Sequence, residues 1–140
     1  MWSIAVGVFV VLACVSGLHV YWGQGGLWPA KSEAELVKTV VGSPKFDRLP
    51  PAVITYGVAV LIFAAALMPG LHLMQVFPDA LSRAALWVLV VVFLGRGAVT
   101  YCVPPVFNGA TEPFRSLNIR YFSPLCLMLG VGYLVFALYS

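Results

Sequence analysis

The chain has 140 residues, of which 61% are hydrophobic and 9% are charged, and its mean hydropathy is +0.97. These values exclude an ordinary soluble domain and indicate a membrane protein. The net charge of +3 is small, and the basic residues lie between apolar runs without aromatic interleaving, which excludes a nucleic-acid-binding protein. The length accommodates about four membrane-spanning helices with their connections. We therefore predict one integral membrane domain over residues 1–140, an all-α bundle of four transmembrane helices.

The first predicted span covers residues 2–22. It ends in Tyr21 and Trp22, an aromatic pair typical of the membrane interface, and His19 lies about one helical turn inside that end. No lysine or arginine precedes the apolar run. We therefore interpret it as an uncleaved span and not as a signal peptide.

The connection after this span contains a predicted short helix. Ser32 and Glu35 have the spacing of a capping box, and apolar residues at 36, 37, 40 and 41 follow them. Two interpretations remain open for this helix. It lies on the membrane surface as an interfacial helix, or it packs beneath its own connection.

The second predicted span covers residues 51–69, and Pro50 and Pro51 precede it. Pro69 and Gly70 interrupt the apolar pattern, which nevertheless continues to Phe77. A kinked continuation of the helix and a turn along the interface are both compatible with this pattern.

The third predicted span, residues 80–103, contains Arg96. Two prolines at 104 and 105 end the helix, so the Arg96 charge begins ~10 Å below that end. Placing a cation in the hydrocarbon core of a membrane costs roughly several kcal/mol of free energy unless the cation is paired, hydrated or able to reach the interface. Other segments should therefore supply partners for Arg96. The fourth predicted span covers residues 121–139.

With four spans, both termini lie on one side of the membrane, and the first and third connections share the other side. Polar and aromatic residues near that second face are expected to form a polar pocket; they are His19, Tyr21, Trp22, Arg96, Glu112, Asn118, Tyr121 and Ser123. The same side carries Lys31, Lys38, Lys45, Arg48, Arg115 and Arg120, whereas the other carries Arg83. The positive-inside rule predicts that the pocket faces the cytoplasm of a bacterial inner (plasma) membrane and that the termini are periplasmic or extracellular.

Three segments resemble a known family. They are residues 18–22 (Leu-His-Val-Tyr-Trp) with two glycines at 25 and 26, the Gly-Arg-Gly of residues 95–97, and residues 114–126, which end in Ser-Pro-Leu-Cys. This pattern resembles DUF3995, a family of uncharacterised small bacterial membrane proteins. The resemblance implies a four-helix membrane protein and no assigned activity.

The chain departs from the family pattern at two positions. Asn118 stands where the family pattern has an aspartate, and Phe122 is inserted between Tyr121 and Ser123. If that aspartate is the counter-ion of the arginine, Arg96 must use Glu112, Asp47, helix-end carbonyls, water or a bound anion.

We hypothesise that the polar pocket binds a ligand that is lipophilic or carries an anionic headgroup. The partner is then a membrane lipid, a lipophilic small molecule, a second copy of the chain or a larger membrane complex. A structural alternative is a hydrogen-bonded bracket between helices. A second alternative is an enzyme acting on a lipid-soluble substrate, with His19 as acid or base and Arg96 as anion stabiliser.

No cofactor and no metal are predicted. Cys14, Cys102 and Cys126 have no metal-ligand spacing, and we expect free thiols. On the opposite face, His72 lies near Met68 and Met74; we interpret this group as apolar packing and not as a copper site.

Overall fold

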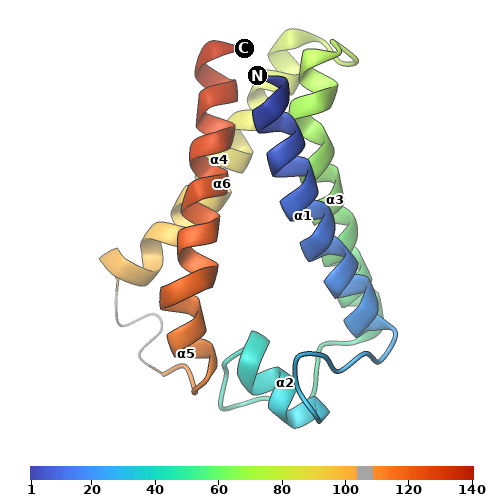
Figure 1. Ribbon diagram of the computed structural model, residues 1–140, viewed down its shortest axis with the longest axis vertical. Coiled ribbons are helices and arrows are strands. Elements are labelled where there is room, and N and C mark those ends of the chain that lie inside the picture. Colours follow the sequence, from blue (N-terminus) through green and yellow to red (C-terminus); the bar gives the residue numbers. More distant parts are fainter. Residues whose placement is uncertain (104–108) are drawn as a thin grey trace.

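The computed structural model describes residues 1–103 and 109–140, which contain helices and no strand (Figure 1). In chain order the helices are α1 (Trp2–Gly23), α2 (Glu33–Val40), α3 (Ala52–Leu73), α4 (Asp79–Cys102), α5 (Phe114–Leu117), the π-helix η2 (Asn118–Phe122) and α6 (Ser123–Tyr139). Four segments of the described chain are long and apolar enough to cross a membrane: α1, α3, α4 and the continuous helix Phe114–Tyr139. The predicted all-α class with four spans is confirmed.

Two spans differ from the predicted boundaries. α3 passes through Pro69 and ends at Leu73, so the helix continues and does not turn along the interface. The last span starts at Phe114, earlier than the predicted residue 121. A proline inside a membrane helix is tolerated where local adjustments satisfy the freed backbone groups.

The π-helix η2 explains how the last span runs without a break. The N–H of Ser123 bonds to the carbonyl of Asn118, five residues back, where an α-helix bonds four back. The wider turn contains Phe122, which the resemblance described above implies is an inserted residue, and it precedes Pro124, which has no N–H to donate. One extra residue is thereby accommodated inside a continuous helix.

The four long helices form two pairs. α1 packs along α3, and α4 packs along α6. Figure 1 shows both chain ends at the same end of the molecule, where the pairs meet, and shows the pairs diverging toward the other end. Tyr133 of α6 is fully buried there, and its hydroxyl donates to the Ala65 carbonyl of α3 at 2.8 Å. The core at this end consists of Ala5, Val8, Leu12, Ala65, Ala66, Leu86, Val90, Leu129, Tyr133, Phe136 and Ala137.

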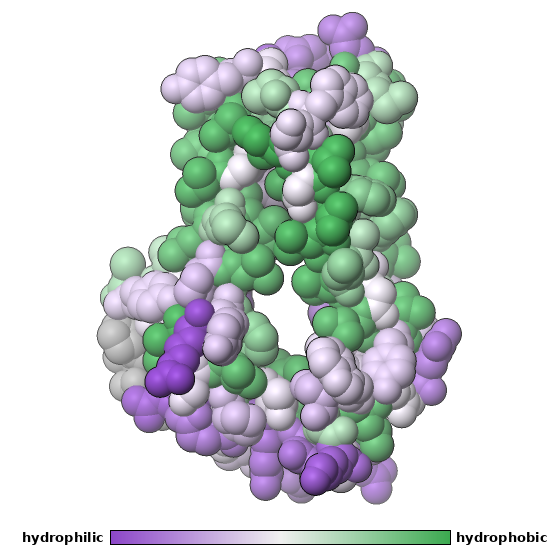
Figure 2. Space-filling model, viewed as in Figure 1, coloured by the Kyte–Doolittle hydropathy of each residue, from purple (hydrophilic) through white to green (hydrophobic). Residues whose placement is uncertain are grey.

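The diverging ends are joined by a structure that we call the α2 bridge, which is α2 with residues 41 and 42. Leu36 and Val37 of the bridge are fully buried. The Thr111 N–H donates to the Gly42 carbonyl at 2.9 Å, and the Phe114 ring covers Gly42. The apolar face of α2 is therefore covered by protein, which favours the helix that packs beneath its connection. Figure 2 shows an opening through the molecule between the two pairs, with hydrophilic residues gathered at the ends.

Gly42 is required at this joint for two reasons. Its φ is +69°, a conformation that L side chains rarely adopt. A Cβ at this position would also lie 2.3 Å from a Phe114 ring atom. The close approach of Phe114 to the backbone thus fixes α2 to the start of the last span.

Candidate functional site

A hydrogen-bonded network lies between α4 and α6. Arg96 Nη2 donates to Asn118 Oδ1 at 2.7 Å, and Asn118 Nδ2 donates to Thr100 Oγ1 at 3.0 Å. The Thr100 and Ser123 hydroxyls lie 2.7 Å apart, and Ser123 Oγ donates to Asn118 Oδ1 at 3.3 Å. Each hydroxyl has one hydrogen, so the bonds run in one direction, from the Asn118 amide through Thr100 and Ser123 back to the Asn118 oxygen. The three residues of this ring are buried and satisfy one another.

Local structure explains the network. Arg96 and Thr100 are four residues apart on α4 and share one helix face. Asn118 and Ser123 flank the π turn, which brings both toward α4. At Gly97 a Cβ would lie 2.9 Å from the Ser123 carbonyl oxygen. The absent side chain therefore permits the close helix approach that short polar side chains need to meet.

Asn118 itself accepts the hydrogen bond from Arg96. The resemblance implies an aspartate at this position, and its absence predicts that Arg96 turns toward other groups such as Glu112. The structure shows instead that the amide oxygen accepts the bond from the same position, although an amide accepts without neutralising the guanidinium charge. Glu112 lies in the connection, where its carboxylate accepts from the Ser116 N–H at 3.3 Å.

His19 lies in a separate cavity on the α1–α3 pair. Its Nδ1 is 2.8 Å from the Val15 carbonyl, and because a carbonyl only accepts, Nδ1 carries a hydrogen. The other ring nitrogen, Nε2, then accepts a hydrogen bond in the neutral imidazole. The ring packs edge-on against Trp22, with centroids 5.2 Å apart. The cavity has a volume of about 160 Å³ and is lined by His19, Trp22, Val40, Val41, Leu49, Pro50, Ile54, Thr55 and Val58.

A larger hollow of about 620 Å³ adjoins this cavity. The two share four lining residues, Val41, Leu49, Pro50 and Ile54. The larger hollow adds Lys45, Phe46, Asp47, Arg48 and Pro51. The combined space is thus apolar inside, with His19 in one wall, and carries two cations and one carboxylate outside.

The structure brings some of the predicted site residues together and separates others. Arg96, Asn118 and Ser123 meet between α4 and α6, whereas His19 and Trp22 line the cavity on the other pair. Figure 1 shows the carboxyl ends of α1 and α4 on opposite sides of the diverging pairs. The count of spans predicts that both helix ends lie on one face of the membrane, but it carries no information about which helices are neighbours. The enzyme hypothesis depended on His19 beside Arg96, and the structure does not bring them together.

Tyr21, Glu112 and Tyr121 lie outside both groups, and Trp22 has a second role beside its place in the cavity wall. The Tyr21 hydroxyl accepts from the Trp28 N–H at 3.3 Å, and Trp22 Nε1 donates to the Trp28 carbonyl at 2.8 Å, so these two aromatic residues shape the turn after α1. Tyr121 is exposed. Sequence reasoning missed Thr100, which its four-residue spacing from Arg96 indicates, and it did not assign Lys45 and Arg48 to a cavity.

Long apolar helices with polar groups gathered at their ends define an all-helical membrane protein. The comparison with family models agrees with the resemblance found in the sequence. The chain belongs to the DUF3995 family, described as a protein of unknown function, and the match covers residues 12–133. No curated protein and no solved structure matches the chain.

Proposed function

We propose that the protein binds an amphiphile with an anionic headgroup in the joined hollows beside His19. The observation that carries this proposal is that the two adjoining hollows have different linings, one mainly apolar and one with basic residues. The inner part offers apolar walls from α1 and α3, and the outer part offers Lys45 and Arg48. A lipid chain fits the first surface, and anionic oxygens are attracted to the second.

The individual groups suit different parts of such a ligand. In its neutral form, the His19 ring offers Nε2 as an acceptor for a headgroup or glycerol hydroxyl. The Trp22 indole N–H is already used by the Trp28 carbonyl, so Trp22 contributes a wall and no donor. Asp47 lies on the same rim and opposes an anion, but the two cations outnumber it. The combined rim therefore favours a negative headgroup.

The proposal is tested with purified protein in mild detergent. Short-chain phosphatidylglycerol, which is anionic, and short-chain phosphatidylcholine, which is zwitterionic, are titrated separately by isothermal calorimetry. We expect tighter binding of phosphatidylglycerol. One basic residue near an anionic headgroup contributes about 1 kcal/mol, so the double variant Lys45→Gln/Arg48→Gln should lose roughly 30-fold in affinity.

Two further variants separate charge from shape. Lys31→Gln removes a cation from the same connection outside the lining of the hollows and should leave the affinity unchanged. Ile54→Trp fills the part that the two hollows share and should abolish binding with both cations in place. Equal affinities for the two lipids, or no response to Ile54→Trp, would exclude the proposal.

We also propose that the α2 bridge faces the cytoplasm of a bacterial inner membrane and that both termini lie outside. The support is the number of basic residues in the first and third connections, against Arg83 on the other side. Single cysteines at positions 1 and 45, in a variant without native cysteines, test this with a membrane-impermeant thiol reagent. We expect labelling of intact cells at position 1 alone, and labelling at position 45 alone would reverse the orientation.

A further inference from the structure

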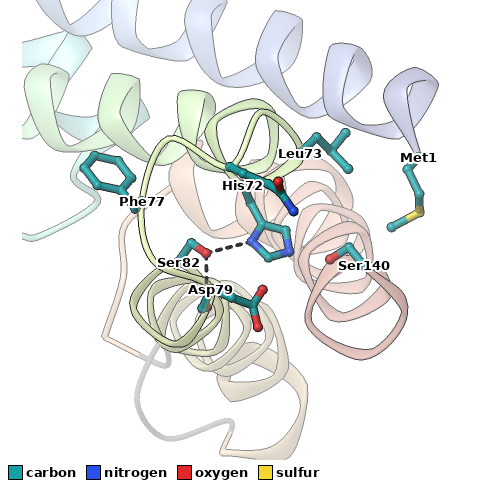
Figure 3. Close-up of a pocket in the computed structure, with 8 residues that line it drawn as sticks. Met1, His72, Leu73, Phe77, Asp79, Ser82 and Ser140 are labelled. Carbon is teal, nitrogen blue, oxygen red and sulfur yellow. Dashed lines mark hydrogen bonds between the residues drawn. The ribbon is translucent and has the colours of Figure 1, made fainter.

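A second pocket lies at the end where the helix pairs meet. It has a volume of about 230 Å³ and is lined by Met1, His72, Leu73, Gln75, Phe77, Asp79, Ser82 and Ser140. Figure 3 shows the His72 ring pointing from α3 into this pocket, between Ser82 on one side and Ser140 on the other. His72 is 7% exposed, so its imidazole is a deeply buried polar group that lines an open volume.

Ser82 fixes the orientation of this ring. The Ser82 hydroxyl is 2.7 Å from His72 Nδ1, 3.1 Å from the Asp79 carbonyl and 3.4 Å from the Pro78 carbonyl. Carbonyls only accept, and the hydroxyl has a single hydrogen. If the Ser82 hydroxyl donates its hydrogen to the Asp79 carbonyl, it can only accept in its contact with His72. His72 Nδ1 then donates to Ser82. In the neutral imidazole Nε2 is then an acceptor on the pocket side, and the described residues supply no hydrogen bond to it.

The lining offers acceptors for a cation's N–H groups. Asp79 brings a carboxylate, and the described lining includes no lysine or arginine side chain, while Met1 brings the amino group of the chain. Arg83 contacts Asp79 from outside at 3.4 Å, and its other bonds go to the carbonyls of Ala137 and Ser140, at 3.2 Å and 2.7 Å. A carboxylate has about four lone-pair sites, so this ion pair leaves acceptor capacity on Asp79.

We propose that this pocket binds a primary ammonium group. Such a group has three N–H donors, which match the Asp79 carboxylate, His72 Nε2 and the Gln75 amide oxygen. A quaternary ammonium has the same charge and no donor, and it leaves the buried His72 nitrogen without a partner. The ammonium comes from the ethanolamine headgroup of a lipid or from a free amine. The pocket uses none of the residues of the His19 cavity, so the two proposals stand or fall separately.

The experiment uses the full chain in mild detergent and three probes titrated by calorimetry. They are short-chain phosphatidylethanolamine, the matching phosphatidylcholine and free ethanolamine. We expect binding of phosphatidylethanolamine and at least about tenfold weaker binding of phosphatidylcholine, because a charge-assisted hydrogen bond is lost. Free ethanolamine that binds as tightly as the lipid identifies a soluble amine as the ligand, and weaker binding identifies the lipid headgroup. Equal affinity for the two lipids, or binding of neither lipid nor ethanolamine, overturns the proposal.

Two variants and one control locate the site. Asp79→Asn removes the carboxylate and should weaken binding of phosphatidylethanolamine about tenfold. Arg83→Gln breaks the same ion pair but keeps the carboxylate, so its affinity should stay at the wild-type level or rise. His72→Asn retains an amide near the position of Nδ1, beside Ser82, and removes Nε2; it should bind more weakly than wild type with an unchanged melting temperature. Wild-type affinity in Asp79→Asn contradicts the proposal.

Discussion

The polar side chains of the two helix pairs differ in what they contact. Between α4 and α6, the buried side chains of Thr100, Asn118 and Ser123 form hydrogen bonds with one another. Because residue 97 is glycine, the two helices approach so closely there that they leave no space for a ligand. Between α1 and α3, the Ser16 hydroxyl donates to the Ala59 carbonyl at 2.8 Å, and farther along the pair His19 lines an open cavity. The α4–α6 residues therefore form a structural bracket, whereas the proposed ligand site lies where His19 lines an open volume.

The largest effect is expected from breaking the α4–α6 network at its centre. Asn118→Leu removes the acceptor for Arg96 and leaves the Thr100 and Ser123 hydroxyls with incomplete partners. The free energy of unfolding should fall by about 3 kcal/mol. Reversible unfolding in mixed detergent micelles measures this change.

Asn118→Asp is the matched control for this variant. It restores a carboxylate opposite Arg96, while Thr100 can turn its hydroxyl to donate to the new oxygen. The stability of this variant should stay within about 1 kcal/mol of the wild type, since one bond of the ring is exchanged for an ion pair. If Asn118→Leu and Asn118→Asp reduced the stability equally, the hydrogen bond from Arg96 to residue 118 would not be what stabilises the protein.

An intermediate effect is expected from separating α4 and α6. A methyl group at Gly97 would lie 2.6 Å from a Leu127 side-chain atom and 2.9 Å from the Ser123 carbonyl oxygen. Gly97→Ala should therefore destabilise the protein by about 1–3 kcal/mol. On the same helix, Gly95 has no atom within 4 Å of the added carbon, and Gly95→Ala should stabilise by about 0.5–1 kcal/mol. Thermal unfolding of the two variants in the same detergent gives opposite signs if the close contact at Gly97 matters.

The smallest effect on stability is expected at His19. Its Nδ1 bonds to a carbonyl of its own helix, and its ring lines the cavity, so His19→Leu breaks no bond between helices. The free energy of unfolding should change by less than about 0.5 kcal/mol, while the affinity for short-chain phosphatidylglycerol should fall. A stability loss as large as that of Asn118→Leu would remove the contrast between the two pairs.

Sequence reasoning predicted the helices better than their neighbours. Long apolar runs indicate spans because a helix of about 20 residues crosses the hydrocarbon core. These helices are apolar on nearly every side, so no face marks a partner, and the pairing of α1 with α3 was not predictable. The approach of Arg96 and Asn118 to one face was predicted, and the structure adds that they touch. Phe122 was identified as an insertion, but a single sequence does not indicate that a π turn accommodates it.

The pairing of the helices also matters for biosynthesis. Each pair consists of two spans that follow one another in the chain, α1 with α3 and α4 with α6. Once α3 has left the translocon, the first hairpin can close along its full length while the ribosome is still producing the rest. Among the described residues, three hydrogen bonds then join the second hairpin to the first: His72 with Ser82, the Thr111 N–H with the Gly42 carbonyl, and the Tyr133 hydroxyl with the Ala65 carbonyl. Assembly in the membrane is therefore expected to proceed hairpin by hairpin, and the bond from Tyr133 to Ala65 to form only after the second hairpin is in place.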